Sequence, residues 1–146
     1  MEPRIVEKDA FTVIGVESTE AHETDDFETP WNDFMSHHGE VKPHSTDGAY
    51  YGVSYGEGGD MRYLAGMAVA GVAQVPEGLT MREVPGGRYA VFECTVATIH
   101  DAYDHIFGEW LPSSGYEHDA RPDFERYGPD TATGEDPVLI HVPVVR

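Results

Sequence analysis

The apolar segments of this chain recur twice in one order, and that order limits the fold more than any other feature. Runs of period two predict strands, and spacings of three to four predict helices. In the first half the order strand, helix, strand, strand falls at residues 11–16, 30–38, 49–55 and 61–70. In the second half the same order falls at residues 88–97, 101–110, 123–127 and 137–145. The sequence therefore predicts a duplicated βαββ pattern, with halves at about residues 1–75 and 76–146.

This pattern predicts an α+β fold, in which two helices pack on one face of an antiparallel sheet. A chain of 146 residues is long enough for one domain with its own core. The other sheet face must be covered or form a groove. We expect a ligand groove on that face, near the junction of the two halves, because pockets favour such interfaces.

Two helices, two connections and one hairpin turn complete the predicted pattern. The first helix has an apolar face with spacings of three and four, made by Trp31, Phe34 and Met35. The second helix has a predicted buried stripe made by Ala102, Ile106, Phe107 and Trp110. Pro112 and Gly115 predict its end at Leu111 or Ser113. Stripes of this kind are usually core, so we interpret Trp31 and Trp110 as core anchors. Residues 18–26 and 76–87 are predicted to be connections, and residues 56–60 a hairpin turn.

The net charge of −18, from 27 acids and nine Lys and Arg residues, limits the class of partner. A chain with so few cations repels nucleic acids and anionic membranes, because their phosphates need Lys and Arg. The charge has two interpretations: a steering field for cationic ligands, or solvation in a salt-rich, halophilic cytosol. Scarce lysine and evenly spread acids favour the second. At molar salt the Debye length is only about 3 Å, which screens steering.

The sequence gives no reason to expect a metal or a cofactor. Cys94 is the single cysteine, in a run typical of a buried strand, so neither a disulfide within the chain nor a CxxC site can form. His37, His38 and His44 lie close together but lack an acid at a spacing that completes a metal site. No apolar run has the length of a signal peptide or membrane span, so we expect a cytoplasmic protein.

The segment at residues 123–127 is the best local indication of a site. Strand geometry places Asp123, Glu125 and Tyr127 on one face and Phe124 and Arg126 on the other. An acid beside a tyrosine, in a chain rich in aromatic residues, indicates a binding site for a cation. The alternative interpretation is a solvated strand face.

Two motifs carry a family resemblance. Residues 110–117 read Trp-Leu-Pro-Ser-Ser-Gly-Tyr-Glu, and residues 122–127 read Pro-Asp-Phe-Glu-Arg-Tyr. In this order they resemble the end of a GyrI-like small-molecule-binding domain, the effector-binding domain fused to some AraC-type and MerR-type regulators and also found alone. Residues 86–92 and 140–144 extend the resemblance, and the first half agrees more weakly. No helix-turn-helix precedes it, so we expect a free-standing member without direct DNA binding.

The resemblance implies that Glu125 lies in a ligand pocket. A carboxylate buried among aromatic rings favours lipophilic cations, since the cation offsets its desolvation and lies against the ring faces. The expected walls of this pocket are Tyr51, Tyr55, Tyr63, Tyr89, Trp110, Tyr116 and Tyr127. Glu93 is a second acid, more typical of a solvated strand. We therefore expect a binding domain for hydrophobic, cationic small molecules.

Two alternatives to simple binding stay open. Some relatives hydrolyse cyclopropane-containing compounds, and Glu125 with a tyrosine can activate a water in the same way. We lean against an enzyme, because no Ser-His-Asp set or metal set is visible. Other members of the family inhibit gyrase through a protein contact, so a protein partner is the second alternative.

Overall fold

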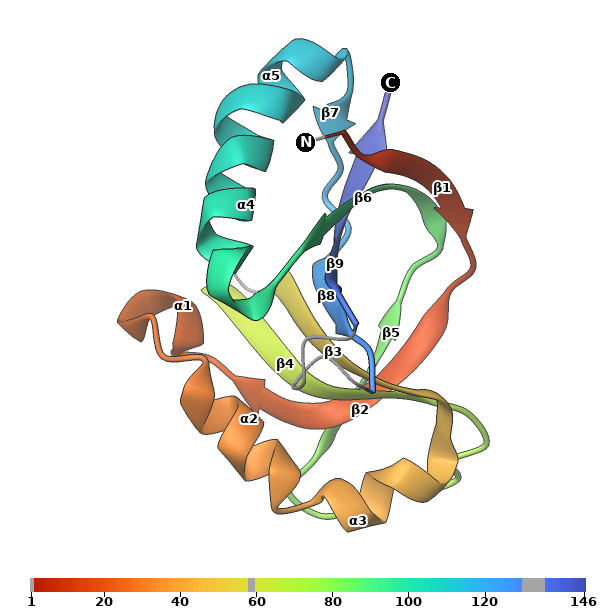
Figure 1. Ribbon diagram of the computed structural model, residues 1–146. Coiled ribbons are helices and arrows are strands. Elements are labelled where there is room, and N and C mark those ends of the chain that lie inside the picture. Colours follow the sequence, from red (N-terminus) through yellow and green to blue (C-terminus); the bar gives the residue numbers. More distant parts are fainter. Residues whose placement is uncertain (1, 58–59, 130–135) are drawn as a thin grey trace.

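The computed structural model describes residues 2–57, 60–129 and 136–146 (Figure 1). Its strands are antiparallel and follow the order β1-β6-β9-β8-β3-β4-β2-β5, with β7 paired to β9. These strands are β1 (Arg4–Lys8), β2 (Phe11–Ser18), β3 (Ser45–Glu57), β4 (Asp60–Val69), β5 (Thr80–Val84), β6 (Gly87–Cys94), β7 (Glu117–His118), β8 (Asp123–Tyr127) and β9 (Val138–Val145). The helical segments are α1 (Ala21–Thr24), α2 (Glu28–Met35), α3 (His38–Val41), η1 (Lys42–His44), η2 (Val96–Thr98), α4 (Ile99–His105), η3 (Ile106–Trp110) and α5 (Leu111–Ser114). Within the described ranges, no helix is both long and apolar enough to cross a membrane.

The two halves of the chain exchange their first strands. β1 pairs with β6 of the second half, and β5 pairs with β2 of the first half. β1 and β2 match β5 and β6 in length and in the gap between them. The sheet is therefore symmetric: read from either edge, the strands of one half follow the same order as the strands of the other half. The two short connections pack together, and a Cβ on Gly86 would lie only 2.7 Å from the carbonyl oxygen of Lys8. Only glycine fits at this crossing.

The predicted α+β class and antiparallel sheet are confirmed, with three additional short strands. The prediction that residues 76–87 form a plain connection was wrong, because they contain β5. β5 is an edge strand that contains the polar residues Arg82 and Glu83. It is a strand because it pairs with β2, and the local sequence pattern does not reveal this pairing. The predicted loop at residues 18–26 contains α1. The second helix ends at Ser114, one residue beyond the predicted boundary. Two residues of the predicted hairpin turn, 58 and 59, lie outside the described residues.

The helices lie on one face of the sheet, as predicted (Figure 1). Each half has its own apolar cluster beneath them. In the first half, Phe34 of α2 packs on Ile14 and Met67. In the second half, Ile106 packs on Phe92 and Ile140. The two clusters are separate, so the region between them can hold a cavity.

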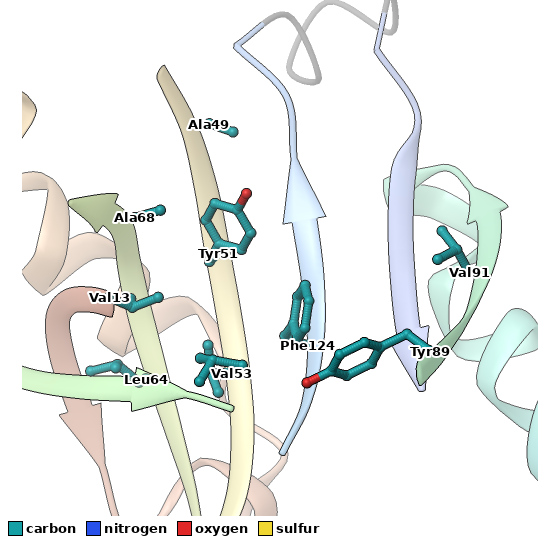
Figure 2. Close-up of a cluster of buried hydrophobic side chains, with 10 residues drawn as sticks. Val13, Ala49, Tyr51, Val53, Leu64, Ala68, Tyr89, Val91 and Phe124 are labelled. Atoms are coloured by element: carbon teal, nitrogen blue, oxygen red, sulfur yellow. The ribbon is translucent and has the colours of Figure 1, made fainter. Parts of the chain in front are cut away.

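The opposite face of the sheet is filled by its own side chains. One cluster contains Val84 from an edge strand together with Val13, Tyr51, Tyr89 and Phe124. Figure 2 shows these strands directing side chains toward a common interior. The sheet therefore curls until its two ends share one core. This corrects the expected groove on the face away from the helices: apolar packing closes that face, and the cavity lies on the helix-covered face.

Candidate ligand-binding site

A cavity of about 1140 Å³ lies on the helix-covered face, between the α1–α2 segment and α4. Both halves of the chain contribute aromatic side chains to its lining: Phe27, Trp31, Tyr50 and Tyr63 from the first half, and Tyr103, Phe107 and Tyr127 from the second. A cavity of this size, with aromatic rings contributed by both halves, accommodates a large apolar ligand.

Glu125 is the buried charged group of this cavity, with only 7% of its surface exposed. The alternation predicted for β8 places it here, while Phe124 enters the core on the opposite face. Its Oε2 accepts a hydrogen bond from the Tyr103 hydroxyl at 2.6 Å. Its Oε1 accepts from the hydroxyls of Tyr127 at 2.7 Å and Tyr63 at 3.4 Å. Three tyrosines from three elements therefore hold the carboxylate in place.

The indole of Trp31 extends this network to α2. Its Nε1–H donates to the Tyr63 hydroxyl at 2.9 Å, which leaves the Tyr63 proton free to point toward Glu125. Its ring also makes an edge contact with the ring of Tyr127, with centroids 5.5 Å apart. The network thus begins in the first half of the chain and ends on a carboxylate of the second half.

Burial raises the pKa of Glu125 above that of an ordinary glutamate, because the charged form is removed from water. The three tyrosine hydroxyls act in the other direction by stabilising the carboxylate, and the nearby charge of Asp123 adds to the rise. Burial, together with the charge of the same carboxylate, raises the pKa values of Tyr63 and Tyr103. The tyrosines consequently stay protonated and remain donors at neutral pH.

This raised pKa predicts how a Glu125→Gln variant changes the pH dependence of stability. The folded state binds the Glu125 proton more tightly than the unfolded chain, whose glutamate pKa is about 4.3. Folding stability from this group is therefore lost as pH rises from that value to the folded pKa, by about 1.4 kcal/mol per pH unit. Urea unfolding between pH 4 and 8 measures it. The free energy of unfolding of the wild type minus that of the variant should fall as the pH rises from 4 towards 8. A difference that is flat or rises would contradict the prediction.

Gly52 faces Glu125 directly across the β3–β8 ladder. Gly15 of β2 and Val91 of β6 are equivalent by the repeat. Their ladder partners through β4 and β9 lead to Tyr51 and Phe124, so the residues that follow these, Gly52 and Glu125, are equivalent as well. The internal symmetry axis therefore passes between a glycine and a glutamate. A Cβ on Gly52 would lie 2.1 Å from the Tyr63 hydroxyl and 3.1 Å from Oε1 of Glu125. The missing side chain makes room for the carboxylate and its tyrosine.

The structure brings together four of the eight residues predicted for the site. Glu125, Tyr63, Tyr127 and Tyr55 line the cavity. The Tyr55 hydroxyl, however, donates to Glu17, and the Arg82 guanidinium lies 5.3 Å from the centre of its ring. Tyr55 therefore forms part of the rim and makes no hydrogen bond to Glu125 among those described.

The other four predicted residues lie elsewhere. Tyr51 and Tyr89 belong to the core of the opposite face, where their hydroxyls donate to Asp47 and to the carbonyl of Pro85. Trp110 packs beneath the second helix against Phe92, with ring centroids 5.1 Å apart, and Tyr116 stacks on Trp110. Trp110 is thus the core anchor that its helical spacing indicates.

Trp31 and Tyr103 are the main cavity residues that sequence reasoning missed. Trp31 packs against the core of the first half, as its helical spacing predicts, but it also lines the cavity, and that spacing cannot separate the two roles. Tyr103 stands beside the predicted buried stripe and stacks on Phe107, one turn later, with ring centroids 6.3 Å apart. This aromatic pair at a spacing of four was the available signal for the second wall.

The mouth of the cavity is acidic. Among the described lining residues, the acids Asp25, Glu28, Asp119 and Asp123 accompany Glu125, and the single arginine, Arg121, donates to Asp119 at 2.6 Å. His118 bonds Asp123 at 2.7 Å, and this carboxylate raises the pKa of the imidazole. The rim therefore favours cations over anions.

Known proteins match both the sequence and the fold. The family described as Cass2, integron-associated effector binding protein, matches residues 4–144. The transcriptional regulator BrlR of Pseudomonas aeruginosa is 32% identical over 130 residues, which cover 87% of this chain and 48% of that protein. The chain thus spans about half the length of this curated relative.

Two solved structures share the fold. A structure of SAV2435 bound to tetraphenylphosphonium has a TM-score of 0.78 and 16% identity, and the match covers 99% of this chain and 94% of that one. A putative bacterial transcription regulation protein from Staphylococcus aureus MU50 has a TM-score of 0.79 and 17% identity, covering 100% and 99%. The resemblance to GyrI-like domains found in the sequence is thereby confirmed. The chain belongs to the Cass2 family of integron-associated effector-binding proteins, within the GyrI-like effector-binding domains.

Proposed function

We propose that the cavity binds hydrophobic, cationic small molecules and that Glu125 supplies the counter-charge. The observation that carries this proposal is a carboxylate, 7% exposed, fixed by three tyrosine hydroxyls in the wall of an aromatic cavity. A buried charge of this kind is offset best by an opposite charge. The ligand-bound SAV2435 structure supports the proposal, because that protein of similar fold holds a lipophilic cation.

The walls explain why the ligand should be flat or bulky and aromatic. Trp31, Tyr103 and Tyr127 line the cavity, and their polar hydrogens already donate within the protein. They therefore offer a ligand their rings rather than hydrogen-bond donors that select one shape. A cation against a ring face gains about 0.5–2 kcal/mol per contact. Apolar contact and one charge therefore provide affinity for a class of compounds rather than for a single molecule.

The test is a titration with tetraphenylphosphonium and with triphenylphosphine oxide, a neutral compound with similar rings. Trp31 lies in the cavity wall, so quenching of tryptophan fluorescence reports binding. Glu125→Gln should weaken binding of the cation about 30-fold, or 2 kcal/mol, the lower end expected when a buried charge loses its partner. The oxide should bind both forms alike.

Glu93→Gln is the matched control, because Glu93 is exposed on β6 and is not among the residues that line the cavity. It should leave the affinity for the cation unchanged. Equal weakening by both variants, or cation binding that survives Glu125→Gln, would contradict the proposal. Mass spectrometry of the recovered ligand addresses the hydrolase alternative, since a binding protein returns it intact. A protein partner that still binds the Glu125→Gln variant would favour the alternative role, inhibition through a protein contact.

A further inference from the structure

The hydrogen-bonding capacity of Glu125 is almost fully used within the protein. A carboxylate has about four lone-pair positions. Oε1 accepts two hydroxyls, from Tyr127 and Tyr63, and Oε2 accepts one, from Tyr103. About one position therefore remains for a ligand. The negative charge is available to a cation, but its acceptor sites mostly are not.

Nearby polar atoms of the cavity also have partners. The Tyr63 hydroxyl already accepts from Trp31, at 2.9 Å. Asp123, two residues from Glu125 on the same face of β8, is bonded through Oδ1 to His118 at 2.7 Å. Around the Glu125 carboxylate itself, the site thus combines a full charge with few free carboxylate acceptor positions.

This combination separates two kinds of cation. A primary ammonium has three N–H donors and, when buried, needs three acceptors. Beside Glu125 it finds about one in the carboxylate, and its other donors meet only neutral tyrosine oxygens, which accept more weakly than a carboxylate. A quaternary ammonium or phosphonium has no donor to satisfy and interacts through charge and contact with the rings.

We infer that the site selects lipophilic cations without N–H donors, such as quaternary ammonium and phosphonium ions, over primary ammonium ions with the same aromatic group. The inference rests on the proposed function and adds the chemical class of the cation. The tyrosines then have two roles: they hold the carboxylate in place, and they occupy the acceptor sites that an amine needs.

The experiment compares pyren-1-ylmethylammonium with its N,N,N-trimethyl derivative by isothermal titration calorimetry at pH 7, where both carry one positive charge. Methyl groups add apolar contact of their own, so the wild-type ratio of dissociation constants alone does not isolate the effect. The decisive quantity is the change in that ratio when an acceptor site is freed. Tyr103→Phe frees one on Oε2, and Tyr127→Phe frees one on Oε1.

In wild type the trimethyl compound should bind more tightly. In each variant the ratio should fall by about tenfold, as expected when one buried donor gains an acceptor. Tyr50→Phe is the matched control: Tyr50 lines the cavity, but its hydroxyl bonds His38 at 2.8 Å, so the ratio should not change.

Tighter wild-type binding of the primary ammonium would overturn the inference. A ratio that stays constant in both Tyr103→Phe and Tyr127→Phe would overturn it as well, while leaving the cation site intact. Absence of wild-type binding by either compound and by tetraphenylphosphonium is a different result, which would overturn the proposed function itself.

Discussion

A Gly15→Ala variant is expected to lose more than about 3 kcal/mol of folding stability, beyond the usual range for overpacked sites. Gly15 of β2 faces Gly66 of β4, and the two backbones approach closely at this pair. An added Cβ on Gly15 would lie 2.0 Å from the carbonyl oxygen of Ala65. Since the obstructing atom belongs to the backbone, neither strand can yield without losing ladder hydrogen bonds. Denaturant unfolding measures the change as a shift in midpoint.

The pair provides its own check. Gly66→Ala should destabilise the fold to a similar extent, because its Cβ would lie 2.1 Å from the carbonyl oxygen of Ile14. Gly108→Ala is the matched control: apart from its chain neighbours and its own helix backbone, no atom of the described residues lies within 4 Å of its added Cβ, and alanine favours the helix by about 1 kcal/mol. Gly15→Ala with stability equal to wild type would show that the two strands are less closely packed than described.

Gly52→Ala should lower folding stability by about 3 kcal/mol and weaken cation binding at the same time. Its Cβ would lie 2.1 Å from the hydroxyl of Tyr63, so the Tyr63 side chain, which is only 2% exposed, has to move from its place. Displacing this ring breaks its hydrogen bonds with Glu125 and Trp31. Chemical unfolding and the tetraphenylphosphonium titration measure the two effects.

A double-mutant cycle assigns the effect of Gly52→Ala to this contact. Tyr63→Phe removes the hydroxyl that the new methyl group would meet, so the double variant should be more stable than the sum of the single changes predicts, by at least 1 kcal/mol. Additive free energies would show that the strain at Gly52 lies elsewhere. Tyr63→Phe alone should retain the fold, since the ring and its apolar contacts remain.

Local pattern predicted the parts of the fold that have strong periodicity. The run at residues 49–55 lies within β3, and the run at residues 61–70 extends one residue beyond the end of β4. The alternation at residues 123–127 correctly separated Glu125 from Phe124. It missed β1 and β5, because five-residue edge strands acquire their identity from pairing with β6 and β2, which are distant in sequence. The high-salt and cytoplasmic setting inferred from composition stays a prediction.

For the site, the family motif indicated Glu125, and aromatic richness indicated rings around it. Neither could select the rings. Tyr51 and Tyr63 are similar in sequence context, yet Tyr51 enters the opposite core and Tyr63 donates to Glu125. The direction in which the sheet curls decides which tyrosines reach Glu125. Curling packs the side chains of one sheet face against each other and leaves a gap between the helices on the other face.

The sequence by itself therefore determined the duplicated strand and helix order, the acid on one face of its strand, and the membership in an effector-binding family, since these depend on local periodicity and short motifs. Only the tertiary structure decided where the cavity lies, which tyrosines reach Glu125 and why residue 52 is glycine. Those features depend on contacts between segments far apart in the chain. Trp31 and Glu125, from opposite halves, belong to one hydrogen-bond network only after the strands have paired.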